Sequence, residues 1–397
     1  MRCMKNVFLI VAVAVMLFAP NAVLAAEADF HIGICTGTVS QAEDDLRGAE
    51  KLIEEYGAVA DGGMIQHITY PDNFMQEMET TITQIVGLAD DPKMKAIIVS
   101  QAIPGVTEAF RRVREKNPDI LLLAVNAHED PLVISEAADL STNFDFIARG
   151  YLIVHTAKEL GCDTFVHISF PRHMSYETLS RRRDIMEKAC NDLGLKFVFE
   201  TAPDPVSDVG VAGAQQYILE KVPAWIEKYG ENSAFFCTND AHTEPLLKQL
   251  LEYGGYFIEA DLPSPLMGYP GALGLDLSDA AGDFPKILTK VEDSIEAKGG
   301  SGRFGTWAYS YGFVSTAGFG ELAKRVIEGD AELTNFDDIM SALSKYTPGT
   351  AWNGSFYTDS NTGTQIDNYV LVYMDTYIMG KGYMGVTDLE VPEKYFK

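Results

Sequence analysis

The chain has 397 residues, 47% of them hydrophobic, and its 57 acidic residues outnumber its 31 basic residues. This length fits two or three domains with apolar cores, so the composition excludes a disordered chain and a small disulfide-bonded domain. The formal net charge of −26 argues against nucleic acid as a partner, because contacts to the phosphate backbone need a basic surface.

The first 25 residues have the three parts of a secretory signal peptide. Arg2 and Lys5 form a basic start, residues 7–18 are an unbroken apolar run, and small residues end the segment at Ala25. A membrane anchor is the alternative, but the apolar run is shorter than the roughly 20 residues that span a bilayer. We therefore expect cleavage after Ala25 and an exported protein without stable membrane insertion.

Four cysteines follow this segment, and export makes a disulfide chemically possible. Their spacing is long and irregular and contains no C-x-x-C, so it indicates neither a zinc ribbon nor a thioredoxin-like site. Cys35 and Cys237 lie in apolar runs and are expected to be buried thiols. A bridge between Cys162 and Cys190 is left open.

Strands and helices alternate in the first half of the chain. Helical periodicity is predicted for residues 41–56, for residues 74–88 and for a helix that opens at Pro104. The predicted strands are residues 30–37, 64–71, 95–103 and 120–126. These strands are continuous Ile/Leu/Val runs, which is typical of a parallel sheet covered on both faces.

The alternation then restarts. A short extended segment at residues 138–145 is predicted to cross to a second unit, and residues 302–312 are a second candidate crossing. Predicted strands cover residues 164–170, 196–201, 233–240 and 256–262. Predicted helices cover residues 146–160, 176–193, 215–229, 244–253, 284–297 and 314–327.

These patterns predict an α/β protein with two doubly wound, Rossmann-like lobes whose parallel sheets are joined by crossing strands. We expect an N-terminal lobe at residues 26–143 with a return segment at 307–330, and a C-terminal lobe at residues 144–306. Residues 331–397 are expected to add a helix and a β-hairpin, because Asn361–Gly363 is a turn signal between two β-rich runs.

Four segments carry a resemblance to a known superfamily. They are HIGICTGTVSQAEDDLRGAEKL, AFFCTNDAHTEPLLKQL, TWAYSYGFVSTAGFGELAKRVIEG and NTGTQIDNYVLVYM, in this order along the chain. With the export signal and the two crossings, the chain resembles the type I periplasmic solute-binding proteins, of the ribose-binding-like and branched-chain-amino-acid-binding-like kind. The resemblance implies a ligand cleft between the lobes. The charged Asp-Arg pair of the ribose-binding branch is replaced by Asn126-Ala127, which puts ribose in doubt.

Ligands of open parallel sheets collect at the carboxyl ends of the strands, so candidate residues are taken from there. In the first half the candidates are Thr36, Thr38, Gln41, Gln101, Asn126 and His128. The resemblance implies a polar ligand contact at Asn126, whereas the two threonines could equally well cap the following helix. Glu43, Asp44 and Asp45 are interpreted as dipole-complementing residues that disfavour a bound phosphate there.

The candidates of the second half are Phe170, Arg172, Arg181, Asn239, Asp240 and Asp261, together with Trp307 and Tyr309 at the second crossing. The resemblance implies an arginine contact to the ligand near Arg181, and bidentate geometry suits that role. The two aromatic residues could stack on a sugar or heterocycle, although packing in the core is the alternative for Trp307. These arginines predict a cleft whose charge is opposite to that of the whole chain.

No catalytic, metal or cofactor motif is present. The seven histidines are dispersed, and neither a G-x-S-x-G elbow nor a Walker loop occurs. We therefore expect a periplasmic, monomeric solute-binding protein that captures a small polar ligand (a sugar, a nucleoside or an amino-acid-like molecule) by hinge closure and delivers it to an ABC-transporter permease. The alternative is a sensory receptor that presents the ligand to a membrane kinase or chemoreceptor.

Overall fold

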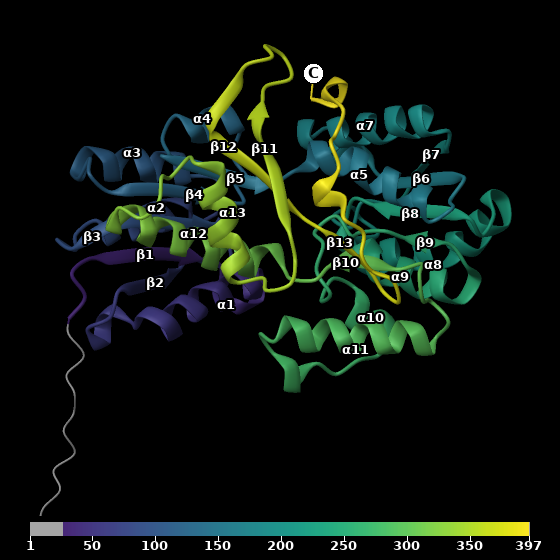
Figure 1. Cartoon of the computed structure of the whole chain (residues 1–397), viewed down its shortest axis with the longest axis horizontal. Helices are drawn as coiled ribbons and strands as arrows, with labels where there is room; N and C mark the ends of the chain where they lie inside the picture. The colour runs from purple at the N-terminus through teal and green to yellow at the C-terminus, as the bar shows by residue number, and fades with distance from the viewer. Residues whose placement is uncertain (1–26, 397) are drawn as a thin grey trace, which may run out of the picture.

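The computed structural model describes residues 27–396, so the predicted signal peptide lies outside the described residues. Two large sheets lie side by side, and each is covered by helices on both faces (Figure 1). The predicted α/β class with two doubly wound sheets is confirmed.

The first sheet has seven strands in the order β11-β12-β5-β4-β3-β1-β2. All neighbouring pairs are parallel except β11 with β12. The strands are β1 (His31–Thr36), β2 (Ile65–Thr69), β3 (Met94–Ser100), β4 (Leu121–Val125), β5 (Leu140–Phe144), β11 (Trp352–Thr358) and β12 (Gln365–Met374). Every residue of β1 is buried, which is why its sequence shows no alternation of polar and apolar residues.

Helices pack on both sides of this sheet. On one side α12 (Tyr311–Glu328) contacts β1, β3 and β4 and lies between α1 (Val39–Tyr56) and α13 (Phe336–Lys345). The other helices of this sheet are α2 (Met78–Leu88), α3 (Val106–Lys116) and α4 (Pro131–Ser135), and a short 3-10 helix, η1 (Val59–Asp61), precedes β2. The central α12 is buried through most of its length, as expected for a helix enclosed by other elements.

The second sheet is wholly parallel and has the order β7-β6-β8-β9. Its strands are β6 (Thr164–Ser169), β7 (Lys196–Thr201), β8 (Ser233–Cys237) and β9 (Tyr256–Phe257). Its helices are α5 (Phe146–Glu159), α6 (Pro171–Met174), α7 (Glu177–Leu193), α8 (Gly210–Tyr229), α9 (Asp240–Tyr253), α10 (Tyr269–Leu273) and α11 (Phe284–Ala297), with the 3-10 helix η2 (Ser278–Ala280) before α11. In Figure 1, α5 and α7 lie above this sheet and α8 and α9 below it.

The strand predicted at residues 256–262 is much shorter than expected. It leaves the sheet after Phe257, because the carbonyl oxygens of Ala260 and Asp261 accept hydrogen bonds from the Arg149 guanidinium, at 2.8 and 3.1 Å. These carbonyls are satisfied by a side chain rather than by a strand neighbour.

The chain passes between the two large sheets three times: from β5 to α5, from β10 (Gly305–Trp307) to α12, and from β12 to β13 (Thr376–Ile378). A small antiparallel sheet, β10-β13-β14 with β14 at Gly382–Tyr383, holds two of these passes together. The chain ends with two 3-10 helices, η3 (Val386–Asp388) and η4 (Glu393–Tyr395).

The buried Glu259 carboxylate joins all three passes. It accepts hydrogen bonds from Arg149 Nε at 3.0 Å, from Trp307 Nε1 at 3.1 Å and from the Thr376 hydroxyl. Arg149 follows the first pass, Trp307 precedes the second and Thr376 follows the third. We call Arg149, Glu259, Trp307 and Thr376 the crossing network. Its polar atoms are hydrogen-bonded to one another, as burial requires.

The crossing strand and the hairpin both extend the first sheet. Within residues 138–145, β5 pairs with β4 on one side and with β12 on the other before the chain passes to α5. The predicted hairpin is present, and its buried segment Tyr369–Val372 aligns with Ser141–Phe144. The lobe boundaries drawn from the sequence remain predictions.

The open disulfide question is answered by the described cysteines. Cys35, Cys162, Cys190 and Cys237 are all free and buried. Burial raises the pKa of the Cys162 and Cys190 thiols to about 12. Within residues 27–396, no helix combines the length and apolar character needed to cross a membrane.

Candidate functional site

A cavity of about 360 Å³ lies between the two sheets at the carboxyl ends of β3 and β4. One side of its wall consists of the first turns of α1 and the residues after β3 and β4, and the other side consists of the start of α9 and residues 262–267. Residues 310–312, on the second pass, complete the wall. The position agrees with the rule that ligands of open parallel sheets bind beyond the carboxyl ends of the strands. We call it the acidic cavity, for the carboxylates described below.

Two amide side chains line the acidic cavity at strand ends. Gln101 follows β3 with φ 50°, and Asn126 follows β4 with φ 51°. In the described part of the chain they are the non-glycine residues with a left-handed backbone. Such a conformation costs about 1–3 kcal/mol and tends to persist where function requires it. Both strained residues therefore mark the same cavity.

Four carboxyl groups line the same cavity: Glu43, Asp44 and Asp45 from α1, and Asp240 from the start of α9. Loss of hydration raises the pKa of the Asp45 carboxyl to about 7. Partial loss of hydration and the nearby Asp261 carboxylate also raise the pKa of Asp240, but this residue stays exposed. A negative charge on the buried Asp45 carboxyl is therefore costly while the cavity holds no cation.

Asp45 is 3% exposed, and only one of its two carboxylate oxygens has a hydrogen-bond partner among the described residues. One of its oxygens accepts a hydrogen bond from Gln101 Nε2 at 3.0 Å, and the other, Oδ1, has no hydrogen-bond partner among the described residues. The start of α12 approaches closely, since a Cβ at Gly312 would lie 2.8 Å from the carboxylate. The positive end of the α12 dipole lies beside Asp45 and partly stabilises a negative charge on its carboxylate.

The remaining wall is mostly apolar, although Ser264 and Ser310 also line it. Leu262, Pro263, Leu266 and Met267 come from the segment that follows the second sheet, and Tyr311 comes from the start of α12. The acidic cavity therefore has a carboxylate wall on α1 and α9 and an apolar wall between them.

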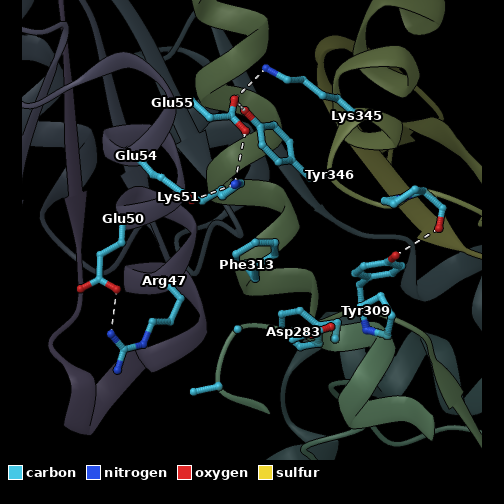
Figure 2. A pocket seen from close by; sticks show the side chains of 15 residues that line it. Arg47, Glu50, Lys51, Glu54, Glu55, Asp283, Tyr309, Phe313, Lys345 and Tyr346 are labelled. Carbon is cyan, nitrogen blue, oxygen red and sulfur yellow. Dashed lines mark hydrogen bonds and ion pairs between the residues drawn. The ribbon is translucent and has the colours of Figure 1, made fainter. Parts of the chain in front are cut away.

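A larger cavity of about 740 Å³ lies along α1, between this helix, α13 and the start of α11 (Figure 2). We call it the α1 cavity. Its charged side chains pair with one another: Arg47 with Glu50 at 2.7 Å, and Lys345 with Glu55 at 2.9 Å. A third cavity of about 320 Å³ shares Glu43 and Asp44 with the acidic cavity and Arg47 and Phe284 with the α1 cavity, so it lies between them. The charges of the α1 cavity are already matched, which makes it the weaker candidate.

The structure brings four of the sequence candidates together. Gln41, Gln101, Asn126 and Asp240 all line the acidic cavity, although they come from four separate segments. Asp261 lies close to Asp240, but its carboxylate forms an ion pair with the fully buried Arg182. Its negative charge is therefore largely matched inside the protein.

The other candidates of the first half lie outside this cavity. Thr36 is buried, where its hydroxyl contacts the Gly37 carbonyl at 2.8 Å and His67 Nε2 at 2.9 Å. Thr38 donates to the Asp72 carboxylate and makes no capping bond to α1. His128 is exposed and is not among the lining residues.

The two arginines predicted as ligand contacts do not line the acidic cavity. Arg172 donates two hydrogen bonds to the Asp204 carboxylate, at 2.7 and 2.9 Å, and holds the pKa of that carboxyl at about 2. Arg181 donates to the carbonyl oxygens of Thr358 and Phe396, at 3.1 and 3.0 Å, so it anchors the C-terminal segment. The positive charge expected in the cleft is therefore not found among the residues that line this cavity.

The aromatic candidates and Asn239 have structural contacts as well. Phe170 is 1% exposed and its ring packs at a tilt against His173, whereas the side chain of Asn239 caps α9 through the Ala241 amide at 3.0 Å. Trp307 is fully buried in the crossing network, so its ring offers no platform to a ligand. Tyr309 lines the α1 cavity and donates to the Pro348 carbonyl at 3.1 Å.

Sequence reasoning missed Asp45 and the apolar segment at residues 262–267 as cavity walls. The three successive acidic residues at 43–45 were visible, but they were interpreted only as partners of the helix dipole. Their position directly beyond the first strand was the available signal. In the part of the chain that the structure describes, no group of three or more His, Cys, Asp or Glu side chains is arranged to hold a metal ion.

Comparison with known proteins places the chain in a family. The family model for DUF3798, proteins of unknown function, matches residues 30–305. An uncharacterised protein of Treponema pallidum (strain Nichols) is 43% identical over 213 residues, which cover 54% of this chain and 96% of the relative. A second uncharacterised protein of the same strain is 44% identical over 179 residues, which cover 45% of this chain and 81% of the relative.

Two solved structures show the fold. A proposed transcriptional regulator from Clostridium difficile 630 has a TM-score of 0.79 and 23% identity, and the match covers 88% of this chain and 99% of that one. A sugar ABC transporter protein from Actinomyces odontolyticus ATCC 17982 has a TM-score of 0.50 and 11% identity, with 92% of this chain and 100% of that one covered. The chain therefore belongs to the DUF3798 family of proteins of unknown function, and its fold is that of the type I periplasmic solute-binding proteins.

Proposed function

We propose that the protein is an exported, periplasmic solute-binding protein. It captures a small polar ligand in the acidic cavity, closes by a hinge motion at the three passes and delivers the ligand to an ABC-transporter permease. It acts by binding rather than by catalysis, and as a monomer.

The observation that carries this proposal is the make-up of the cavity wall. Gln101 and Asn126 follow strands of the first sheet, whereas Asp240 and residues 262–267 follow strands of the second. A ligand that touches both sides favours the closed arrangement by its difference in affinity between the open and closed states. The strained backbone at both amides supports a functional role for this wall.

The first experiment is a thermal-shift screen of the mature protein against sugars, nucleosides, amino acids and small organic amines. A compound that binds only the folded state raises the melting temperature, by a free energy of about 2.7 kcal/mol at 100 times its dissociation constant. If none of these compounds raises the melting temperature while a chromogenic substrate is turned over, the binding-protein proposal fails.

A gene deletion in the source bacterium distinguishes a transport function from a sensory function. Deletion of the gene should abolish high-affinity uptake of the radiolabelled ligand, and re-expression should restore it. Normal uptake together with the loss of a ligand-dependent change in transcription or motility would instead identify a sensory receptor.

A further inference from the structure

We propose that the acidic cavity binds an organic cation, whose ammonium or guanidinium group lies against Asp45 and Asp240 and whose apolar body lies against residues 262–267. This inference rests on the proposed function and names the chemical class of its ligand.

The charges around the cavity have one sign. Its lining residues include four carboxyl groups and no lysine or arginine. Arg47, in the adjoining third cavity, pairs with Glu43 at 3.1 Å and with Glu50 at 2.7 Å. Within residues 27–396, neither Asp45 nor Asp240 forms an ion pair with a lysine, arginine or histidine. A cationic group would therefore find two carboxylates without a charged partner.

The second observation is the unsatisfied oxygen of Asp45. Oδ1 is buried and has no hydrogen-bond partner among the described residues, although the side chain is 3% exposed and lines the cavity. Buried polar atoms are nearly always hydrogen-bonded, and an exception calls for a missing partner. An ammonium or guanidinium group supplies both the missing donor and the missing charge.

The carboxyl groups come from both sides of the cleft. Asp45 belongs to α1, which covers the first sheet, and Asp240 begins α9, which covers the second. Burial raises the pKa of the Asp45 carboxyl to about 7, whereas Asp240 stays exposed at the opposite wall. A cation between them removes this penalty and attracts both walls, so binding and closure would be coupled.

The apolar wall indicates an organic ligand. Leu262, Leu266 and Met267 line the same cavity as the carboxylates. A fully hydrated inorganic ion gains nothing from these side chains, whereas an alkyl or aryl body buries its surface against them. The cavity volume of about 360 Å³ lies within the range of small-molecule sites.

The test is a calorimetric and thermal-shift comparison of matched probes with the mature protein. The cationic probes are butylamine, 1,4-diaminobutane, agmatine, lysine and arginine. The uncharged probes are butanol and 1,4-butanediol, norleucine is the zwitterion that lacks only the side-chain ammonium group of lysine, and butyrate is the anion. At least one cationic probe should bind saturably and raise the melting temperature, whereas its uncharged counterpart of equal length should bind at least tenfold more weakly.

Variants then locate the binding site. Asp45→Asn and Asp240→Asn should each weaken binding of the best cation at least tenfold, with little change in its uncharged counterpart. Asp90→Asn is the matched control, because Asp90 is exposed at the end of α2 and pairs with Lys116 on the surface. Circular dichroism and the melting temperature without ligand establish that each variant is folded.

The outcomes separate this inference from the proposed function. If a sugar, nucleoside or anion binds in the cavity and no cationic probe does, the cation inference is overturned and the proposed function stands. If calcium or magnesium chloride alone gives saturable binding that Asp45→Asn abolishes, while the organic cations give none, an inorganic ion is the ligand and the inference is again overturned. If no probe and no library compound binds, both fail.

Discussion

Asn126 and Gln101 show how single residues mark the site. Each follows a buried strand and takes a left-handed backbone, which glycine would adopt at lower cost. Amide side chains thus stand at two strained positions around one cavity, which is why we propose both as ligand contacts.

Asn126→Gly is expected to weaken ligand binding without destabilising the fold. The variant loses the amide but relieves the left-handed strain, so the free energy of unfolding should stay within about 1 kcal/mol of the original. Urea denaturation and calorimetry with the best ligand measure the two effects. A variant that loses stability and keeps its affinity would show that Asn126 has a structural role only.

Asp45 gives the protein a pH dependence. Burial raises its pKa in the folded state from 3.8 to about 7, so the folded Asp45 carboxyl binds more protons than the unfolded one between these values. The contribution of Asp45 to the stability of the unliganded protein should therefore fall as the pH rises from about 4 to 7 and be fully lost above 7. The neighbouring Asp44 carboxyl, whose pKa is also raised by burial, acts in the same direction.

Asp45→Asn should remove this part of the pH dependence of the free energy of unfolding. It should stabilise the unliganded protein by about 2–4 kcal/mol at pH 8. Denaturant titrations between pH 4 and 8 measure the effect. Asp72→Asn is the control, because hydrogen bonds from Thr38 and Ser40 lower the pKa of this exposed carboxyl and its influence lies below pH 4. An unchanged pH dependence in Asp45→Asn would contradict the assignment.

Among the helices and strands, the crossing network is the main contact that holds distant elements together. It ties α5, β10 and β13 to one buried carboxylate, so the three passes share one anchor on the side of the second sheet. Arg149 also satisfies the carbonyl groups of the irregular segment after β9. The network therefore shapes the segment that leads into the apolar cavity wall.

Arg149→Met should destabilise the protein by about 3–5 kcal/mol, because it leaves the Glu259 charge buried without its partner. The double variant Arg149→Met/Glu259→Gln should recover a large part of this loss, which a double-mutant cycle in urea would measure. Arg112→Met, which breaks exposed pairs with Glu108 and Glu79, is the control and should change the free energy of unfolding little. Additive effects at Arg149 and Glu259 would contradict the coupling.

At the scale of the whole molecule, the acidic cavity is shared between two sheets that three chain passes connect. Small-angle X-ray scattering should show a smaller radius of gyration when the best ligand is added to the mature protein. Asp240→Asn should reduce this change at ligand concentrations that saturate the original protein, since it removes one carboxylate from the wall. A ligand that binds tightly without any change in scattering would argue against hinge closure.

Much of the fold could be predicted from local patterns. The continuous apolar runs at His31–Thr36 and Met94–Ser100 predicted buried parallel strands, and Gln101 and Asn126 were found because strand ends are visible in sequence. The partner of a long side chain is not visible in this way. Arg181 looked like a ligand contact, yet it binds carbonyl groups more than 170 residues away along the chain.

The sequence by itself determined the alternation of strands and helices, the superfamily resemblance and the strand ends where a site could form, because these depend on the spacing of neighbouring residues. The tertiary structure decided the sign of the charge in the cleft. Arginines and carboxylates distant in sequence compete for partners, and packing brings Arg149 to Glu259, 110 residues away. Asp45 and Asp240 are left without a charged partner, so the cavity carries the same sign as the chain.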